Sequence, residues 1–405
     1  MSAVAANAPL PQGRSGGWIS SPGWDLFWMF STLWGAALLL GGSAFLGIAS
    51  VALAIFFFDR IISVVHAWST TYMVLFSPLW SAERRQNPRK YVYVPLAIAT
   101  ACVLLGLYVA AYQRFPADGR LTAALWGWAL YVGVFWVGHF WHFGNQDFGV
   151  LSIYRTRAGQ TGPLDRRVDK LYTAVMMFAI QPVVYLTIVK TTGFAEVAHS
   201  WLPLDQAAMS VAAAVCIAAA CLCSLAVIGF ELSKPNRSLP KLLYYGVIFL
   251  HPVLFYATAK TREITYGHLF VLAYFWSHWF IAIGLVSRIN TRFYQRRGDS
   301  HGRALARHAG LLALILAVVW LITHNFGEYL LFNTDRFRYK EILAGITPGQ
   351  TTVIGLLLGF FLAEQLIHYY CDRCLFRFRE PAVRRTVAPL LLASPPGKAR
   401  AAGAQ

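Results

Sequence analysis

The chain has 405 residues, of which 57% are hydrophobic and only 13% are charged, and its formal net charge is +17. Soluble domains carry roughly 25% charged residues, so this composition excludes an ordinary soluble domain and indicates a membrane protein. The Lys and Arg residues gather in short segments between apolar runs, which is typical of a topology signal. We therefore expect no nucleic-acid partner, despite the positive charge.

Apolar windows of about 20 residues, the length that crosses a bilayer as a helix, recur along the chain. They predict about ten spans, at 25–41, 44–77, 92–113, 121–144, 170–190, 207–230, 242–259, 267–288, 308–332 and 350–375. The pair Gly41-Gly42 is the expected boundary between the first two. The pattern predicts an all-α, polytopic membrane helix bundle.

Residues 24–379 are expected to form a single transmembrane domain. Residues 1–23 are mostly small or polar and precede this domain without the apolar core of a signal peptide. Residues 380–405 are rich in Arg, Ala and Pro, and we expect them to be a disordered tail.

The loops after the second, fourth, sixth and eighth predicted spans are rich in Lys and Arg, whereas the alternate loops carry fewer. The last of these basic segments contains Arg288, Arg292, Arg296, Arg297, Arg303 and Arg307. Cytoplasmic loops carry the excess of Lys and Arg in membrane proteins. The alternation predicts cytosolic N- and C-termini in a multi-pass protein of a bacterial-type inner membrane.

Five histidines lie inside apolar runs of the predicted spans: His66, His139, His142, His278 and His368. At 1.5 Å per residue, four spans place imidazole within roughly 10 Å of one depth, in the cytosolic half. Ionisable side chains in a membrane usually face the interior of the bundle, and neutral imidazole is the commonest metal ligand. This layer predicts a buried metal centre; hydrogen bonds between helices are the simpler alternative for each histidine taken alone.

The spacing of the polar residues along the helices also fits metal ligation. His139 and His142 are three residues apart, and Glu364, His368 and Asp372 form a ladder at intervals of four. Imidazole and carboxylate from neighbouring helices are the ligand set of non-haem iron sites with one or two ions. The predicted metal ligands are His66, His139, His142, His278, Glu364 and His368.

Two polar residues are expected to take part in catalysis without being ligands. Gln146 lies four residues beyond His142, and Asp372 lies four beyond His368, towards the cytosolic mouth of the predicted site. There they would orient the imidazoles or deliver protons.

Further polar residues in the spans have other expected roles. His251 precedes Pro252, whose missing N–H frees a backbone acceptor, so we expect a structural hydrogen bond and no loss of metal when His251 is replaced. His268, His324 and Glu328 lie nearer the outer side, where an interfacial network is favoured and a second site is the alternative.

The run His-Phe-Gly-Asn-Gln-Asp-Phe at 142–148 resembles a stretch of the bacterioopsin-related family, the bacterial membrane beta-carotene dioxygenases. The aromatic-rich segment 274–278 and the His-x-x-x-Asp of 368–372 are similar to later segments of that family. The resemblance implies that His142 and His278 are iron ligands and that His66 supplies the ligand of an early helix. The family's Pro-His-Gly sequence around that early ligand reads Val-His-Ala here.

These observations predict a membrane-embedded non-haem iron oxygenase that acts on a lipophilic small molecule, with oxygen as co-substrate, membrane lipid around it and an electron donor that the sequence does not identify. A b-type haem protein for electron transfer is one alternative, because two imidazoles on separate helices can clamp a haem. A metal- or proton-coupled transporter is another, and it requires polar residues across the whole membrane.

Overall fold

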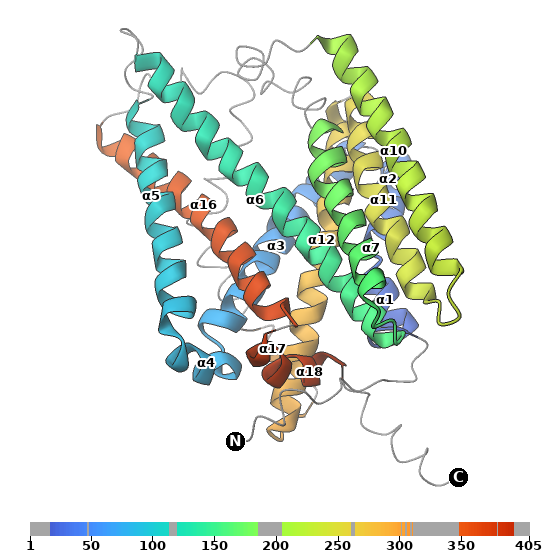
Figure 1. The fold of residues 1–405 in the computed structure, drawn as a ribbon. Helices are drawn as coiled ribbons and strands as arrows, with labels where there is room; N and C mark the ends of the chain where they lie inside the picture. Colours follow the sequence, from blue (N-terminus) through green and yellow to red (C-terminus); the bar gives the residue numbers. More distant parts are fainter. Residues whose placement is uncertain are drawn as a thin grey trace, which may run out of the picture.

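The computed structural model describes residues 17–46, 48–112, 120–184, 205–260, 264–300, 302–303, 306–307, 310, 348–378 and 380–392. Within these ranges the chain forms helices and short connections and contains no strand, which confirms the all-α prediction. The long helices stand side by side as a bundle (Figure 1).

The bundle is built from eight long helices among the described residues. They are α2 (Ser31–Leu46), α3 (Ile48–Leu75), α5 (Val94–Tyr112), α6 (Arg120–Arg157), α10 (Gln206–Leu232), α11 (Leu239–Lys260), α12 (Ile264–Arg296) and α16 (Pro348–Phe376). Shorter helical elements connect or cap them: α1 (Pro22–Trp28), η2 (Pro78–Trp80), α4 (Ser81–Gln86), η3 (Arg89–Tyr93), α7 (Pro163–Ala174), η4 (Val175–Ile180), α17 (Pro381–Thr386) and α18 (Ala388–Leu392).

Three helices in the described part of the chain are long and apolar enough to cross a membrane: Arg89–Ala111, Ala207–Leu232 and Thr351–Phe376. The outer face of α10 exposes large apolar side chains, including Val215 and Leu222, as a surface against lipid would. The larger number of ten spans stays a prediction, and the expected span 308–332 lies outside the described residues except for residue 310.

The predicted boundary at Gly41-Gly42 is wrong. Helix α2 continues through both glycines to Leu46, and α3 begins at Ile48. Glycine is common in the helices of membrane proteins, where each backbone group must keep its hydrogen bond, so a glycine pair breaks such a helix less readily than a soluble one.

The basic loops lie together at one end of the bundle, the lower end in Figure 1. We call this the basic end, and it contains the connections that follow α3, α6, α10, α12 and α16. It carries Arg84, Arg155, Lys234, Arg292 and Arg377, among others. The basic loops that alternate in the sequence therefore lie together at one end of the bundle. The side of a membrane that this end faces stays a prediction.

The prediction of a disordered tail from residue 380 is wrong for residues 381–392. Helices α17 and α18 fold against the end of α12, where Arg288 Nε and Arg292 donate hydrogen bonds to the carbonyls of Leu391 and Leu390, each at 3.0 Å. Val387 and Leu391 are fully buried there. Burial of apolar side chains and hydrogen bonds from arginines here outweigh the tendency to disorder that the Pro- and Arg-rich composition indicates. Residues 393–405 lie outside the described part.

Three glycines let α5 and α16 pack backbone to backbone. Gly355 and Gly359 lie four residues apart on α16 and face Gly106 on α5. A Cβ atom added to Gly355 would lie 2.8 Å from the Cα of Leu107, closer than real contacts allow. Small residues at this spacing are typical of close helix packing in membranes. The contact fixes α16, the helix that carries His368 and Asp372.

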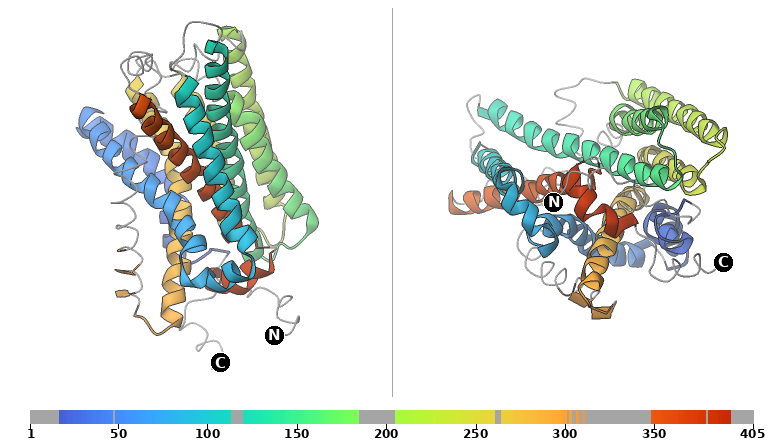
Figure 2. Two further views of the ribbon diagram at one scale, coloured as in Figure 1. Left: turned by 90° about the vertical axis from the view of Figure 1, so that its left-hand side faces the viewer. Right: turned by 60° about the horizontal axis from the view of Figure 1, so that its bottom comes forward.

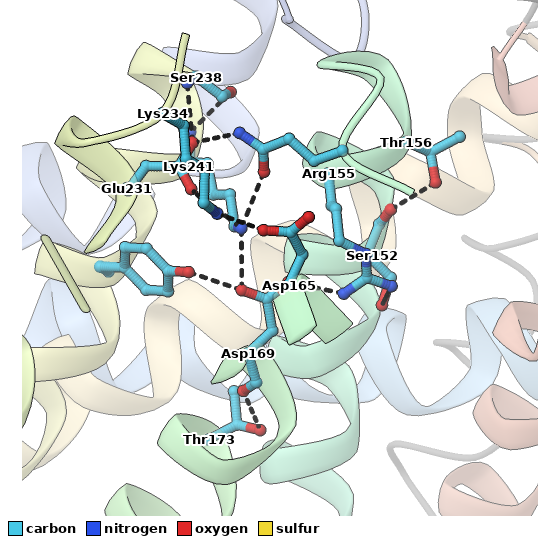
Figure 3. A network of polar contacts seen from close by, with 12 residues as sticks. Ser152, Arg155, Thr156, Asp165, Asp169, Thr173, Glu231, Lys234, Ser238 and Lys241 are labelled. Atoms are coloured by element: carbon cyan, nitrogen blue, oxygen red, sulfur yellow. Dashed lines mark hydrogen bonds and ion pairs between the residues drawn. The ribbon is translucent and has the colours of Figure 1, made fainter. Parts of the chain in front are cut away.

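A buried ion network joins α6, α7, α10 and α11 at the basic end (Figure 3). Its members are Arg155, Gln160, Asp165, Asp169, Glu231, Lys234 and Lys241. The ammonium of Lys241, which is fully buried, lies 3.0 Å from Asp169 and 3.2 Å from Glu231. Burial alone would lower the pKa of Lys234, but hydrogen bonds to Asp165 and Glu231 raise it above its ordinary value. Carboxylates and cations thus satisfy one another in this network.

Candidate metal centre

The first histidine group consists of His66 on α3, His142 on α6 and His368 on α16. One potential ligand atom of each lies within 4.8 Å of the others. All three side chains are buried, and the Nε2 atoms of His66 and His368 are 2.7 Å apart. The rings of His142 and His368 have their centroids 4.8 Å apart. Three helices far apart in sequence thus bring three imidazoles to one point.

Asp372 lies next to this group, one turn beyond His368 on α16. Its carboxylate oxygens lie 3.5 Å from His368 Nδ1 and 3.8 Å from His142 Nε2. The hydroxyl of Thr70 on α3 is 2.8 Å from His368 Nδ1. A hydrogen bond at Nδ1 leaves Nε2 as the coordinating nitrogen of a metal-binding histidine. Thr70 is therefore placed to orient His368 through a hydrogen bond, whereas Asp372, whose carboxylate forms no hydrogen bond within the described residues, acts on His368 through its charge.

The second histidine group consists of Asp147 on α6, His251 on α11 and His278 on α12. Their potential ligand atoms also lie within 4.8 Å of one another, and all three side chains are fully buried. The phenol of Tyr244 donates a hydrogen bond of 2.8 Å to Asp147 Oδ1, which leaves Oδ2 3.8 Å from His251 Nδ1. Two imidazoles and one carboxylate thus converge from three helices.

Gln146 holds His278 through two contacts. Its Nε2 donates to the backbone carbonyl of His278 at 2.8 Å, and its Oε1 lies 3.3 Å from His278 Nδ1. This is the orienting position that the sequence predicts for Gln146. A carboxamide oxygen at Nδ1 makes that nitrogen the protonated one and leaves Nε2 available as a ligand.

The two groups are neighbours because α6 contributes to both. The ring of Phe143, which follows His142, stacks on His278 with 3.5 Å between centroids and lies 5.5 Å from the ring of His142. Phe143 therefore contacts one imidazole of each group. The arrangement resembles two adjacent sites more than one site with many ligands.

Two predicted ligands are not brought into either group. His139 lies among aromatic rings, including those of Phe135 and Phe143, and its Nδ1 is 3.4 Å from the Tyr369 hydroxyl. At 3.6 residues per turn, positions three apart point about 60° away from each other, so His139 and His142 do not meet the same neighbours. Glu364 lies one turn before His368 and accepts a 2.7 Å hydrogen bond from the Trp68 indole.

Sequence reasoning missed Asp147 and His251 as candidate ligands. The sequence is consistent with Asp147 either supporting a ligand or capping the helix end, and with His251 forming a structural hydrogen bond, so neither is predicted to bind metal. His251 does form a contact of 3.1 Å between its Nε2 and the Ser277 hydroxyl. For His251 the available signal was an ionisable residue inside an apolar run, which marks a candidate functional position. Asp147 lies beyond the predicted span 121–144 and gave no such signal.

The outer polar residues are not tested by the structure. The side chain of His268 and the whole of His324 and Glu328 lie outside the described residues. An interfacial network or a second site formed by them stays a prediction.

A cavity of about 510 Å³ reaches the first histidine group from the basic end. His142, Gln146, Tyr369 and Asp372 line its inner part. This volume lies within the about 300–1,000 Å³ that small-molecule pockets enclose. The candidate centre is therefore buried yet adjacent to a space that can hold a ligand.

The charges around the two groups differ from those of an ordinary buried ion pair. Among the described residues, no Lys or Arg pairs with Asp147 or Asp372, whose only ion-pair contacts are to histidines. His142 Nε2 and Asp147 Oδ2 also have no hydrogen-bond partner within the described ranges. Buried polar atoms without partners are rare and call for an explanation, such as a bound ion. A cation in each group would satisfy the unpaired atom of that group.

Comparisons of the chain with protein-family models, with curated proteins and with solved structures find no match. The resemblance to the bacterial membrane dioxygenases therefore stays a prediction from short motifs, and the site has to be interpreted from its own chemistry.

Proposed function

We propose that the protein is a membrane-embedded non-haem iron oxygenase that acts on a lipophilic substrate. The observation that carries the proposal is the convergence of two adjacent sets of buried ligand atoms, one with three imidazoles and one with two imidazoles and a carboxylate. Within the described residues, no Lys or Arg pairs with the carboxylate of Asp147 in the second set or with that of Asp372 beside the first.

The donor atoms favour iron among the metals that proteins use. Imidazole and carboxylate suit iron and zinc, and two histidines with one carboxylate are the facial ligand set of non-haem iron oxygenases. Cys371 and Cys374 are buried near the basic end of α16, but neither belongs to a ligand group. A soft, sulfur-rich site for copper(I) or an iron–sulfur cluster is therefore disfavoured.

The geometry of the first group disfavours a haem. Two axial histidines lie on opposite faces of a macrocycle, whereas the Nε2 atoms of His66 and His368 are only 2.7 Å apart. Two nitrogens bound to one ion at about 2.1 Å and a right angle would be about 3 Å apart. The 2.7 Å contact, a hydrogen bond between the two imidazoles in the structure, supports neighbouring ligands of one ion over the two axial ligands of a haem.

The residues around the groups have roles that follow from their contacts. The two groups would each hold one iron ion, which when bound would supply the capacity to activate oxygen. Asp372 and Gln146 hold the imidazoles in orientation through His368 and His278. The aromatic rings of Phe143 and Tyr369 stack on the imidazoles of His278 and His142 and hold them in place. The cavity beside His142 and Asp372 offers the substrate a place next to the first group.

Elemental analysis and a visible spectrum of the detergent-purified protein test the proposal. We expect up to two equivalents of iron and no Soret band. His142→Ala and His278→Ala should each lose about half of the metal while the protein still inserts and folds, because they belong to different groups. His251→Ala should behave like His278→Ala, which revises the sequence-based expectation.

His139→Ala is the matched control, since His139 is a buried histidine on the same helix as His142 but outside both groups. Full metal content in both His142→Ala and His278→Ala would overturn the proposed centre. A Soret band would replace it with a haem protein, and protein prepared without chelators that contains no metal would replace it with a transporter or a structural role.

A further inference from the structure

The cavity beside the first histidine group has an apolar wall and a positively charged outer part. Trp141, Phe148 and Phe178 line its length, and His142 and Asp372 line its inner end. Its other charged lining residues are Arg155, Arg166, Lys170, Arg373, Arg377 and Arg384. Asp372 is thus the only carboxylate among the lining residues, and it belongs to the metal site.

Two of these cations are already matched by carboxylates. Arg155 forms a 2.6 Å ion pair with Asp169, and Arg377 forms one of 3.1 Å with Glu380. Arg166, Lys170 and Arg373 form no ion pair within the described part of the chain. Like charges around one concave space raise the local concentration of anions, so the outer part of the cavity favours a negatively charged group.

The dimensions fit a single extended apolar chain. His142 and Arg155 both line the cavity and are separated along α6 by thirteen residues, or roughly 20 Å at 1.5 Å per residue. An anionic group at the outer end would therefore be followed by an apolar wall that leads to the ligand atoms. A neutral lipid would use the wall and leave the three cations without a counterion.

We propose that this cavity binds a single-chain amphiphile with an anionic head group, with the head on Arg166, Lys170 and Arg373 and the chain running along the aromatic wall towards His142. Arginine pairs in a forked geometry with carboxylate and phosphate alike, so both head groups satisfy the same site. The inference names the substrate class of the proposed oxygenase and rests on that function for the reaction, whereas binding itself does not require the metal.

Equilibrium binding to the full-length protein in nanodiscs of neutral lipid tests this proposal. The probes are palmitate, palmitoyl lysophosphatidate and the uncharged monopalmitoylglycerol. The variant is Arg166→Gln with Lys170→Gln. Its control is Arg167→Gln with Arg237→Gln, which removes the same charge from exposed residues that do not line the cavity. Metal content is measured on every sample.

We expect the double variant to bind at least one anionic probe about tenfold more weakly, with little change for the control or for the uncharged probe, because exposed ion pairs each contribute up to about 1 kcal/mol. Stronger binding of palmitate or of lysophosphatidate identifies the head group. Equal binding of an anionic probe to the variant and the control, or a preference for the uncharged probe, would overturn the inference. Charge-dependent binding to a protein without metal would refute the proposed oxygenase and leave the inference standing.

Discussion

The ion network at the basic end and the two histidine groups are both buried polar regions of one bundle. Only in the ion network are carboxylates and cations paired with one another. The network contains three carboxylates, of Asp165, Asp169 and Glu231, and three cations that pair with them (Figure 3). The histidine groups contain five imidazoles and the carboxylate of Asp147, and Asp372 lies beside the first. Neither carboxylate has a Lys or Arg partner in the described residues.

The difference teaches how buried polarity divides between stability and function. Removing one member of a satisfied ion network leaves an uncompensated charge, so the network holds helices together. Buried ligand atoms that converge without a Lys or Arg partner carry a desolvation cost that a bound cation would offset, and such arrangements are typical of functional sites. Figure 2 shows from two further sides that the helices contributing to the two regions belong to one bundle.

Breaking the network should give the largest effect on stability. Lys241→Met removes the cation between Asp169 and Glu231, and we expect a loss of about 3–5 kcal/mol in unfolding free energy. Thermal unfolding in detergent measures it, with exposed Lys170→Met as the control. The metal content per folded molecule should not change. A variant as stable as the control would show that the network does not stabilise the bundle.

A bulky side chain between α5 and α16 should disturb the first histidine group and leave the ion network and the second group intact. Gly359→Leu places atoms against the backbone of Val103, and overpacking of this kind costs about 1–3 kcal/mol. Because α16 carries His368 but no member of the network, we expect loss of the metal of the first group while that of the second is retained. Gly229→Leu on α10 has open space and serves as control. Equal metal loss from both groups would argue against their independence.

Asp372→Asn should give the smallest and most local effect. The amide keeps the size of the side chain but removes the negative charge beside His368 and His142, and loss of such an orienting group weakens metal affinity by about 10–100-fold. Metal titration of the purified protein measures this change. Glu364→Gln, an acid two turns earlier on α16 that contacts Trp68, should bind metal as the unmodified protein does. Similar weakening in both variants would show that Asp372 contributes no more to metal binding than Glu364 does.

The positions of most long helices and the depth of the histidines along them could be predicted from the sequence, because both follow from local patterns. Apolar windows predicted helices near the observed positions of α5, α6, α10, α11, α12 and α16. The same windows failed at Gly41-Gly42 and at α17 and α18, where tertiary contacts outweigh local composition. The side chains of His66, His142, His278 and His368 are buried in the interior, as their apolar surroundings indicated.

The sequence by itself determined that the protein is an all-α chain with a membrane protein's composition, buried imidazoles and basic loops. Only the tertiary structure decided that those imidazoles divide into two groups, that Asp147 and His251 join the second, and that His139 and Glu364 stay outside both. Depth along a helix follows from residue number, since each residue adds 1.5 Å. The partner of a side chain depends on how each helix is rotated and which helix packs beside it, and neither is contained in a local pattern.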